Sequence, residues 1–347
     1  MTVKSAKETA IEWVTQYAVK EKWFIGAYFS GSIIGMPDNA ELSECSDVDI
    51  VIVLNQDEPP LKLGKFLYNG VLLEVTYLSW KKLSSAEQIL TSYHLAGSFQ
   101  MDTIIMDPTG HLKSLQEQVS YNFAKKDWVL RRCENVLIKI ESGLKGINTT
   151  APYYDLVTSW LFPTGVTTHL FLVAALQNPT VRKRYLAARK VLLDYGYEEI
   201  YEKLLELLGC ANLTPQRMEQ HLNNLEKTFD VAAAVAKTPF FFSSDITSSA
   251  RPIAIDGSRN LIRTGNHREA VFWIVATFAR CHKILAADAV MEVQKAHMLP
   301  FKEMIADLGI VSDNDFIRRS QEVLQILPKL WEVTVDIISR NPNVIDK

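Results

Sequence analysis

The chain has 347 residues, with 37 Lys+Arg against 40 Asp+Glu, a formal net charge of -3 and a sequence pI near 6.2. Apolar residues make up 48% and charged residues 22%, which is typical of soluble globular proteins and excludes disordered, collagen-like and fibrous chains. The slightly acidic balance also argues against a dedicated nucleic-acid binder, because it supplies no general attraction for phosphate backbones.

The first 125 residues alternate between helical and strand-like patterns. Helical spacing of apolar residues predicts helices at 6–22, 82–93 and 112–123. Short β-rich runs separated by turn residues predict strands at 23–30, 48–54, 71–78 and 103–106. Short strands with helices beside them predict an α/β or α+β sheet domain over residues 1–125.

After Ala124 the pattern is helical throughout. Eight helices are expected, at 127–144, 154–177, 180–195, 198–208, 215–236, 267–289, 301–308 and 313–339. The segment 240–264 is rich in Ser, Gly and Pro and is expected to be a long loop. The length allows two domains at roughly 100–200 residues each, so residues 126–347 are predicted to form a second, all-α bundle.

Charge is divided unevenly between these two parts. Residues 1–125 hold 10 Lys, no Arg and 15 acidic residues, whereas the remainder holds 27 basic and 25 acidic residues. If the first part binds an anionic ligand, metal ions and the second part must supply most of the positive charge.

Cysteine usage and hydropathy indicate a cytoplasmic protein outside the membrane. The cysteines are far apart in the sequence, without a CxxC pair, and are expected to be free thiols; they are Cys45, Cys133, Cys210 and Cys281. The N-terminal residues show an amphipathic helical pattern in place of a signal-peptide core. The most apolar stretch, 156–176, contains Pro163, Gly165 and His169 and is expected to be too polar to span a bilayer.

The residues that carry chemistry lie around the second predicted strand. Asp47 and Asp49 are two residues apart at its start, so both side chains leave the same face and offer oxygen ligands for hard divalent ions such as Mg²⁺. Gly31 and Ser32 follow the first predicted strand, where a backbone N–H and a hydroxyl can meet a phosphate without a bulky side chain in the way.

A third acid, Glu74, is the only charged residue of the run 70–78. Burial of an unpaired carboxylate is costly, so Glu74 is expected to meet a metal or a cation. If its strand pairs beside the second strand, Glu74 completes a three-carboxylate metal site suited to displacement at phosphorus. The alternative is a salt bridge to a lysine such as Lys65.

The order of Gly31-Ser32, Asp47-x-Asp49 and Glu74 resembles the nucleotidyltransferase superfamily that includes DNA polymerase β. Within it the chain looks most like kanamycin nucleotidyltransferase and other aminoglycoside adenylyltransferases, over residues 20–120. The resemblance implies an α+β fold with a nucleotidyltransferase-type mixed sheet. It also implies Mg²⁺-dependent transfer of a nucleoside monophosphate, with ATP as the expected donor, to a hydroxyl of a small molecule with release of pyrophosphate.

The resemblance also assigns roles to residues. Asp47, Asp49 and Glu74 would ligate two metal ions, and Gly31 and Ser32 would hold the triphosphate. The antibiotic-modifying members use a further carboxylate to deprotonate the acceptor, for which the candidates are Glu141 and Asp155.

A basic run opens the helix expected at 180–195. Arg182 and Arg184 stand near its N-terminus, where positive charge opposes the helix macrodipole. They are expected to reach the triphosphate or an acidic acceptor, and the alternative is a solvated basic face.

Other functions stay open at this point. One is a nucleotidyltransferase acting on a protein side chain or an RNA end, the latter disfavoured by the missing basic stripe. Another is a nucleotide-binding regulator without catalysis, which the presence of all three carboxylates weakens. A homodimer is also open, because related enzymes build sites across two chains. No Walker, GxGxxG or GxSxG motif supports a kinase, a dehydrogenase or an acyl hydrolase.

Overall fold

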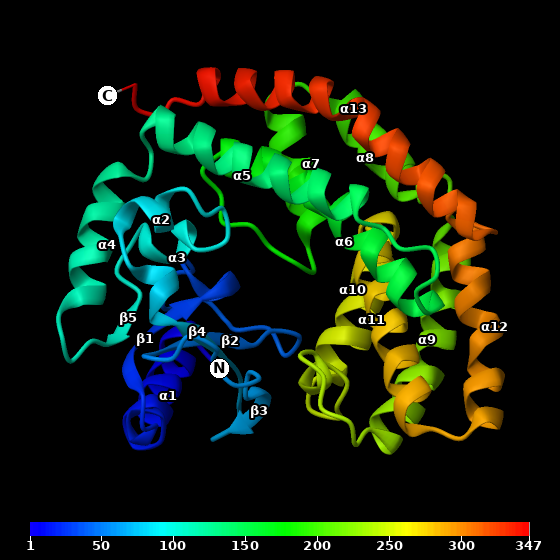
Figure 1. The fold of residues 1–347 in the computed structure, drawn as a ribbon, viewed down its shortest axis with the longest axis horizontal. Helices are drawn as coiled ribbons and strands as arrows, with labels where there is room; N and C mark the ends of the chain where they lie inside the picture. The colour runs from blue at the N-terminus through cyan, green and yellow to red at the C-terminus, as the bar shows by residue number, and fades with distance from the viewer. Residues whose placement is uncertain (347) are drawn as a thin grey trace.

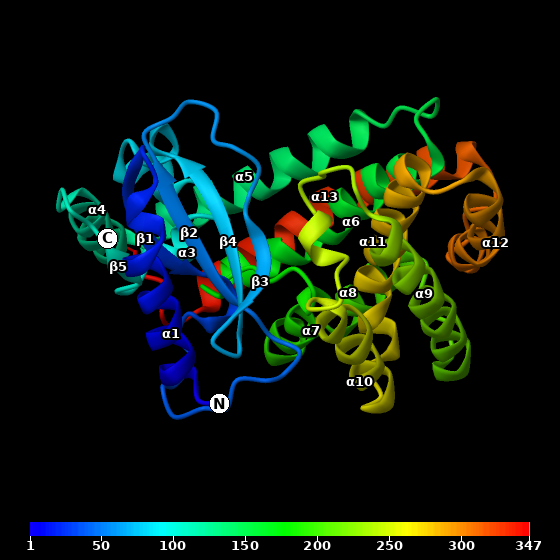
Figure 2. The same cartoon turned by 90° about the horizontal axis from the view of Figure 1, so that it is seen from below.

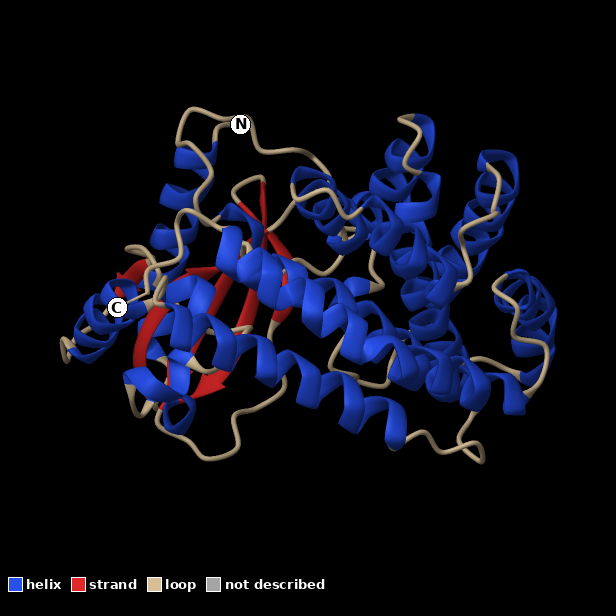
Figure 3. Ribbon diagram, turned by 90° about the horizontal axis from the view of Figure 1, so that it is seen from above, coloured by secondary structure: helices blue, strands red, loops and turns tan. Residues whose placement is uncertain are grey.

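The structure is a computed structural model that describes residues 1–346, and it confirms an α+β protein. A five-stranded sheet with its helices occupies the N-terminal part, and the rest of the chain is helical (Figure 1). Figure 3 shows the strands gathered on one side of the molecule and helices over the remainder.

The sheet is mixed and has the strand order β3-β4-β2-β1-β5. Its strands are β1 (Phe24–Ser30), β2 (Val48–Leu54), β3 (Gly64–Tyr68), β4 (Val71–Ser79) and β5 (Ile104–Met106). Strands β2 and β4 run parallel, and the other neighbouring pairs run antiparallel. The four predicted strands are confirmed to within a residue at each end.

Strand β3 was not predicted, although the sequence contains a signal for it. Asn69 and Gly70 both have positive φ, 45° and 80°, and join β3 to β4 as a tight hairpin. An Asn-Gly pair between two runs of strand-forming residues is a strong hairpin signal, because the favoured two-residue turns need positive φ. The strand it adds forms one edge of the sheet.

Helices cover both faces of this sheet. Helix α1 (Val3–Gln16) contributes Ala6, Ala10 and Val14 to the core that contains Ile50 and Ile52. The opposite face packs under the next helices along the chain, which are α2 (Ala86–Leu90), α3 (Ala96–Phe99) and α4 (His111–Asn122). The predicted helix at 82–93 is wrong in its first part, because Ser85 caps the start of α2 and a 3₁₀ turn precedes it.

The helical part contains a core of its own, with buried residues from Val129 to Ile338. Its helices are α5 (Lys126–Lys145), α6 (Tyr153–Ala174), α7 (Arg184–Asp194), α8 (Glu198–Leu208), α9 (Pro215–Val235), α10 (Gly257–Arg263), α11 (His267–Asp288), α12 (Met291–Asp307) and α13 (Asp313–Arg340). The tail returns to the junction between the parts, where the N–H of Lys126 donates to the carbonyl of Ile345 at 2.8 Å. Two domains divided at residue 125 stay a prediction.

Three predictions for the helical part are corrected. The segment 240–264 is not a loop throughout, because Ile253, Ala254 and Ile255 are buried in a π-helical turn that leads into α10. Packing here overrides the low helix propensity of the segment. Helix α12 begins ten residues earlier than predicted and continues through Pro300, and α7 begins four residues later than predicted.

Two helices, α6 and α11, are long and apolar enough to cross a bilayer by length and composition. In each, 78% of the most apolar window is buried inside the protein. Burial to this extent is expected of core helices in a bundle, not of helices that face lipid. The four cysteines are free, as predicted.

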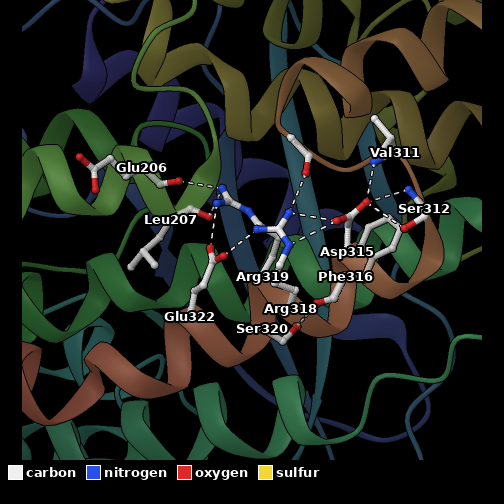
Figure 4. A network of polar contacts seen from close by, with 11 residues as sticks. Glu206, Leu207, Val311, Ser312, Asp315, Phe316, Arg318, Arg319, Ser320 and Glu322 are labelled. Atoms are coloured by element: carbon white, nitrogen blue, oxygen red, sulfur yellow. Dashed lines mark hydrogen bonds and ion pairs between the residues drawn. The ribbon is translucent and has the colours of Figure 1, made fainter.

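Arg319 links helix α13 to the end of α8 (Figure 4). Its guanidinium donates to the carbonyls of Glu206 and Leu207 at 2.7 and 3.0 Å and pairs with Glu322 at 2.9 Å. A surface cavity of about 450 Å³ lies beside this contact. The arginine donates to two carbonyls in the last turn of α8, where backbone donors of the helix run out, which gives it a structural role.

Candidate active site

The register of the sheet brings four polar residues into one row across four strands. Ser30 pairs with Asp49, Asp49 with Glu74, and Glu74 with Lys65. Residues paired directly across a sheet project from the same face, so this row collects two acids and a lysine. Asp47, two residues before Asp49, adds a third acid. Carboxylate oxygens of Asp47, Asp49 and Glu74 all lie within 4.8 Å of one another, which confirms the predicted convergence.

Gly31 follows directly at the end of β1. Its φ is +68°, and a Cβ atom at this position would overlap the carboxylate of Asp49. The carbonyl of Gly31 accepts a hydrogen bond of 3.1 Å from the side chain of Asn178. Ser32 is exposed in the same short turn. A glycine is therefore required here both by the backbone conformation and by the close approach of Asp49.

Two lysines enter the acidic cluster from β3 and the segment before it. The Lys65 ammonium lies 3.0 Å from a carboxylate oxygen of Asp47, and it also pairs with Glu74, whose other oxygen binds Lys62. The alternative of a salt bridge between Glu74 and Lys65 is therefore confirmed alongside the convergence of the acids. Burial would raise the pKa of Glu74, but the two ammonium groups outweigh it and lower the pKa to about 2.

Asp49 is the carboxylate of the cluster without a cation. No salt bridge to Asp49 occurs within residues 1–346, and burial together with the charges of Asp47 and Glu74 raises its pKa well above the usual range. Burial also raises the pKa of Asp47, partly offset by Lys65. A buried carboxylate that lacks a cation is unstable in its charged form. The donor set of hard carboxylate oxygens suits Mg²⁺, which would remove this instability.

The helical part reaches the cluster through a second set of contacts. Asp245, in the 3₁₀ turn Ser243–Asp245, lies 2.8 Å from the Lys65 ammonium and 3.0 Å from the Arg280 guanidinium of α11. Arg182 donates to the carbonyl of Cys45 at 2.9 Å, two residues before Asp47. The loop between α9 and α10 that carries Asp245 lies beside β3 (Figure 2). The expectation that the helical part supplies most of the protein's positive charge here is wrong, because Lys62 and Lys65 of the N-terminal part are the cations paired with Asp47 and Glu74, and the helical part adds Arg182 and Arg280.

Four residues of the site carry no functional signal in the sequence: Lys62, Asn178, Asp245 and Arg280. Asp245 lies in the segment predicted as a loop, and its contact with Lys65 joins residues 180 positions apart. No periodicity or local motif signals such a contact.

The remaining predicted site residues make contacts elsewhere. Glu141 pairs with Lys145 one turn along α5 at 2.6 Å, and Asp155 pairs with Lys283 of α11 at 2.7 Å. Arg184 is buried, donates to the carbonyl of Val181, and lies over the ring of Phe272 at 3.9 Å. No hydrogen bond or ion pair in the described chain links these three to the acidic cluster. Their roles as general base and phosphate ligand stay predictions.

Comparisons with known proteins find likeness among solved structures alone. No family model and no curated protein matches the chain. Among solved structures, the chain is similar to a nucleotidyltransferase-like protein from Exiguobacterium sibiricum 255-15, at 16% identity and a TM-score of 0.29. The match covers 75% of this chain and 91% of that protein's chain. A likeness this distant does not place the chain in a family, so its function follows from the geometry of the site.

Proposed function

We propose that this protein is a Mg²⁺-dependent nucleotidyltransferase that transfers a nucleoside monophosphate from ATP, or another nucleoside triphosphate, to a hydroxyl of a small molecule. The proposal is supported by the cluster of Asp47, Asp49 and Glu74, which lies beside the short turn that begins at Gly31. The bond that forms joins the acceptor oxygen to the α-phosphorus. The bond that breaks joins that phosphorus to the oxygen that leaves with pyrophosphate.

The residues present divide the work of binding. Asp47 and Asp49 would hold Mg²⁺, which supplies positive charge against the negative charge that develops on the phosphate oxygens. The exposed hydroxyl of Ser32 can donate to a phosphate oxygen, and the missing side chain at Gly31 lets the Asp49 carboxylate lie against this turn. Arg182, held at the carbonyl of Cys45, adds a cation near Asp47.

The acceptor hydroxyl must lose a proton during transfer, and a carboxylate within hydrogen-bond reach of it can act as the base. Asp155 and Glu141 stay the candidates, each now paired with a lysine. The helical part is proposed to shape the acceptor pocket. A small-molecule acceptor is preferred to RNA because the chain has a net charge of -3 and no basic stripe.

The test is pyrophosphate release from ATP in the presence of Mg²⁺ and a panel of hydroxylated acceptors. Asp49→Asn removes the charge that holds the ion and is expected to lower the rate at least a hundredfold while the fold is retained. Asp57→Asn, at an exposed pair with Lys81, is the matched control and should leave the rate unchanged. Near-normal turnover by the Asp49→Asn protein would reject the proposal.

A nucleotide-binding regulator without catalysis is the second candidate. One observation favours it: both carboxylate oxygens of Glu74 are bound by lysines, so this acid is not free as a ligand. Isothermal titration of ATP with and without Mg²⁺, alongside the pyrophosphate assay, separates the two. Mg²⁺-dependent binding without pyrophosphate release for any acceptor class, protein and RNA included, would favour the regulator.

A further inference from the structure

Lys65 lies among the acids as a fixed part of the site. Strand register places it directly opposite Glu74, and its side chain is only 6% exposed. Its ammonium contacts three carboxylates. Asp47 directly precedes β2, Glu74 belongs to β4, and Asp245 belongs to the helical part. An exposed lysine with a mobile side chain would not keep contacts with three carboxylates at once.

The partner from the helical part is itself held in place. The Asp245 side chain is 8% exposed, and its second oxygen binds Arg280, whose guanidinium lies 5.1 Å from the centre of the Trp273 ring. Asp245 therefore keeps Lys65 at the cluster from the side opposite to the sheet. Lys65 is paired with three carboxylates at once, so the site contains a cation supplied by the protein itself.

The charges show how much positive charge the site still lacks. Four acids meet here, Asp47, Asp49, Glu74 and Asp245, and three cations, Lys62, Lys65 and Arg280, are paired with them. The one acid left without a cation is Asp49. The deficit is one charge, and one divalent ion at Asp49 and Asp47 more than offsets it. A second ion would have to displace a buried ammonium from both Asp47 and Glu74.

We propose that Lys65 is a built-in cation and that the site binds a single divalent ion, held by Asp49 and Asp47. Glu74 then positions Lys65 and is not a metal ligand. This inference rests on the proposed function for the use of the ion, and it replaces the sequence-based expectation of two ions. The ion count can be measured without turnover, so the two proposals can fail separately.

The experiment counts Mn²⁺ ions on the full chain by equilibrium dialysis, with and without an ATP analogue whose α and β phosphorus atoms are bridged by methylene. The wild-type protein is expected to bind one ion per chain in both conditions, and the Asp49→Asn protein none. Two ions on the wild-type protein would overturn the role of Lys65 and leave nucleotidyl transfer intact. No bound ion in either condition would overturn both proposals.

Variants of the two lysines test the assignment directly. Lys65→Met is expected to admit a second Mn²⁺ when the analogue is present. Lys62→Met removes the other cation on Glu74 without opening Asp47, and should keep a count of one. A single ion on a folded Lys65→Met protein, judged by circular dichroism, would refute the proposal.

A third substitution decides the question should Lys65→Met fail to fold. Glu74→Gln keeps the size of the side chain and is expected to retain one Mn²⁺, with affinity within about threefold of wild type, because Glu74 is not a ligand. If instead Glu74→Gln loses the ion as Asp49→Asn does, Glu74 ligates metal and the inference is wrong.

Discussion

Gly31 leaves no room for a side chain beside the acidic cluster. Alanine at this position has to adopt a φ of +68° and to share space with the carboxylate of Asp49. Gly31→Ala is therefore expected to weaken Mn²⁺ binding and slow pyrophosphate release by tenfold or more. Gly70→Ala is the matched control, because its φ is +80° and a Cβ there has nothing within 4 Å. Gly70→Ala should lose about 1 kcal/mol of stability through its φ alone, and Gly31→Ala should lose more because its Cβ also overlaps Asp49. Equal loss of Mn²⁺ binding in the two variants would contradict the explanation.

His169 is expected to make the protein sensitive to acid. Burial, together with the charge of Arg184, lowers its pKa to about 3, while one ring nitrogen lies 3.1 Å from the carbonyl of Thr180. The unfolded chain takes up a proton at this residue near pH 6.5, and the folded chain does not until about pH 3. The contribution of His169 to the free energy of unfolding is therefore complete above about pH 6.5. It falls as the pH decreases, by up to about 1.4 kcal/mol per pH unit.

The measurement is urea denaturation of wild-type and His169→Gln proteins between pH 7 and 4.5. Glutamine can still donate to the carbonyl of Thr180, but it does not titrate. The variant should show a shallower fall in unfolding free energy over this range. Parallel curves would mean that His169 is not the residue responsible.

At the scale of elements, the sequence predicts what is encoded locally. Strand β2 is a continuous apolar run, and Asp47 and Asp49 stand at its start, so both the strand and its acids could be found from spacing alone. Strand β3 is short, and it contributes to the site because its pairing with β4 places Lys65 opposite Glu74. The contact of Lys65 with Asp245 depends on how the helical part packs against the sheet, which no local pattern specifies.

The contact between α13 and α8 gives a prediction at the same scale. Arg319→Met removes the donors to the last carbonyls of α8 and is expected to lower the free energy of unfolding by about 1–3 kcal/mol. Lys329→Met removes only an exposed pair with Glu332 and should cost less than about 1 kcal/mol. Chemical denaturation measures both, and neither change should alter Mn²⁺ binding. A larger loss for Lys329→Met would contradict the assigned role of Arg319.

For the whole molecule, polar contacts near the acidic cluster join the sheet part to the helical part. The buried clusters of the sheet part and of the helical part contain different segments of the chain. Between the parts, Asn178 binds the carbonyl of Gly31, Arg182 binds the carbonyl of Cys45, and Asp245 binds Lys65. The Arg182 contact ends two residues before Asp47, the Asp245 contact ends at Lys65, and Gly31 lies against the carboxylate of Asp49. The position of the helical part and the geometry of the site are therefore coupled.

Asp245 provides the test of this coupling. Asp245→Asn leaves Lys65 and Arg280 without their shared partner, and loss of one member of a buried charge network costs about 3–5 kcal/mol. We expect a loss of this size in urea denaturation, together with faster hydrogen exchange in β3 and in residues 243–245. Asp230→Asn is the control, since its pair with Arg251 is half exposed and lies wholly in the helical part. That change should cost less than about 1 kcal/mol and leave exchange in β3 unaltered. Equal effects of the two substitutions would show that Asp245 stabilises the protein no more than a surface ion pair does, and that the sheet and the helical part are held together by other contacts.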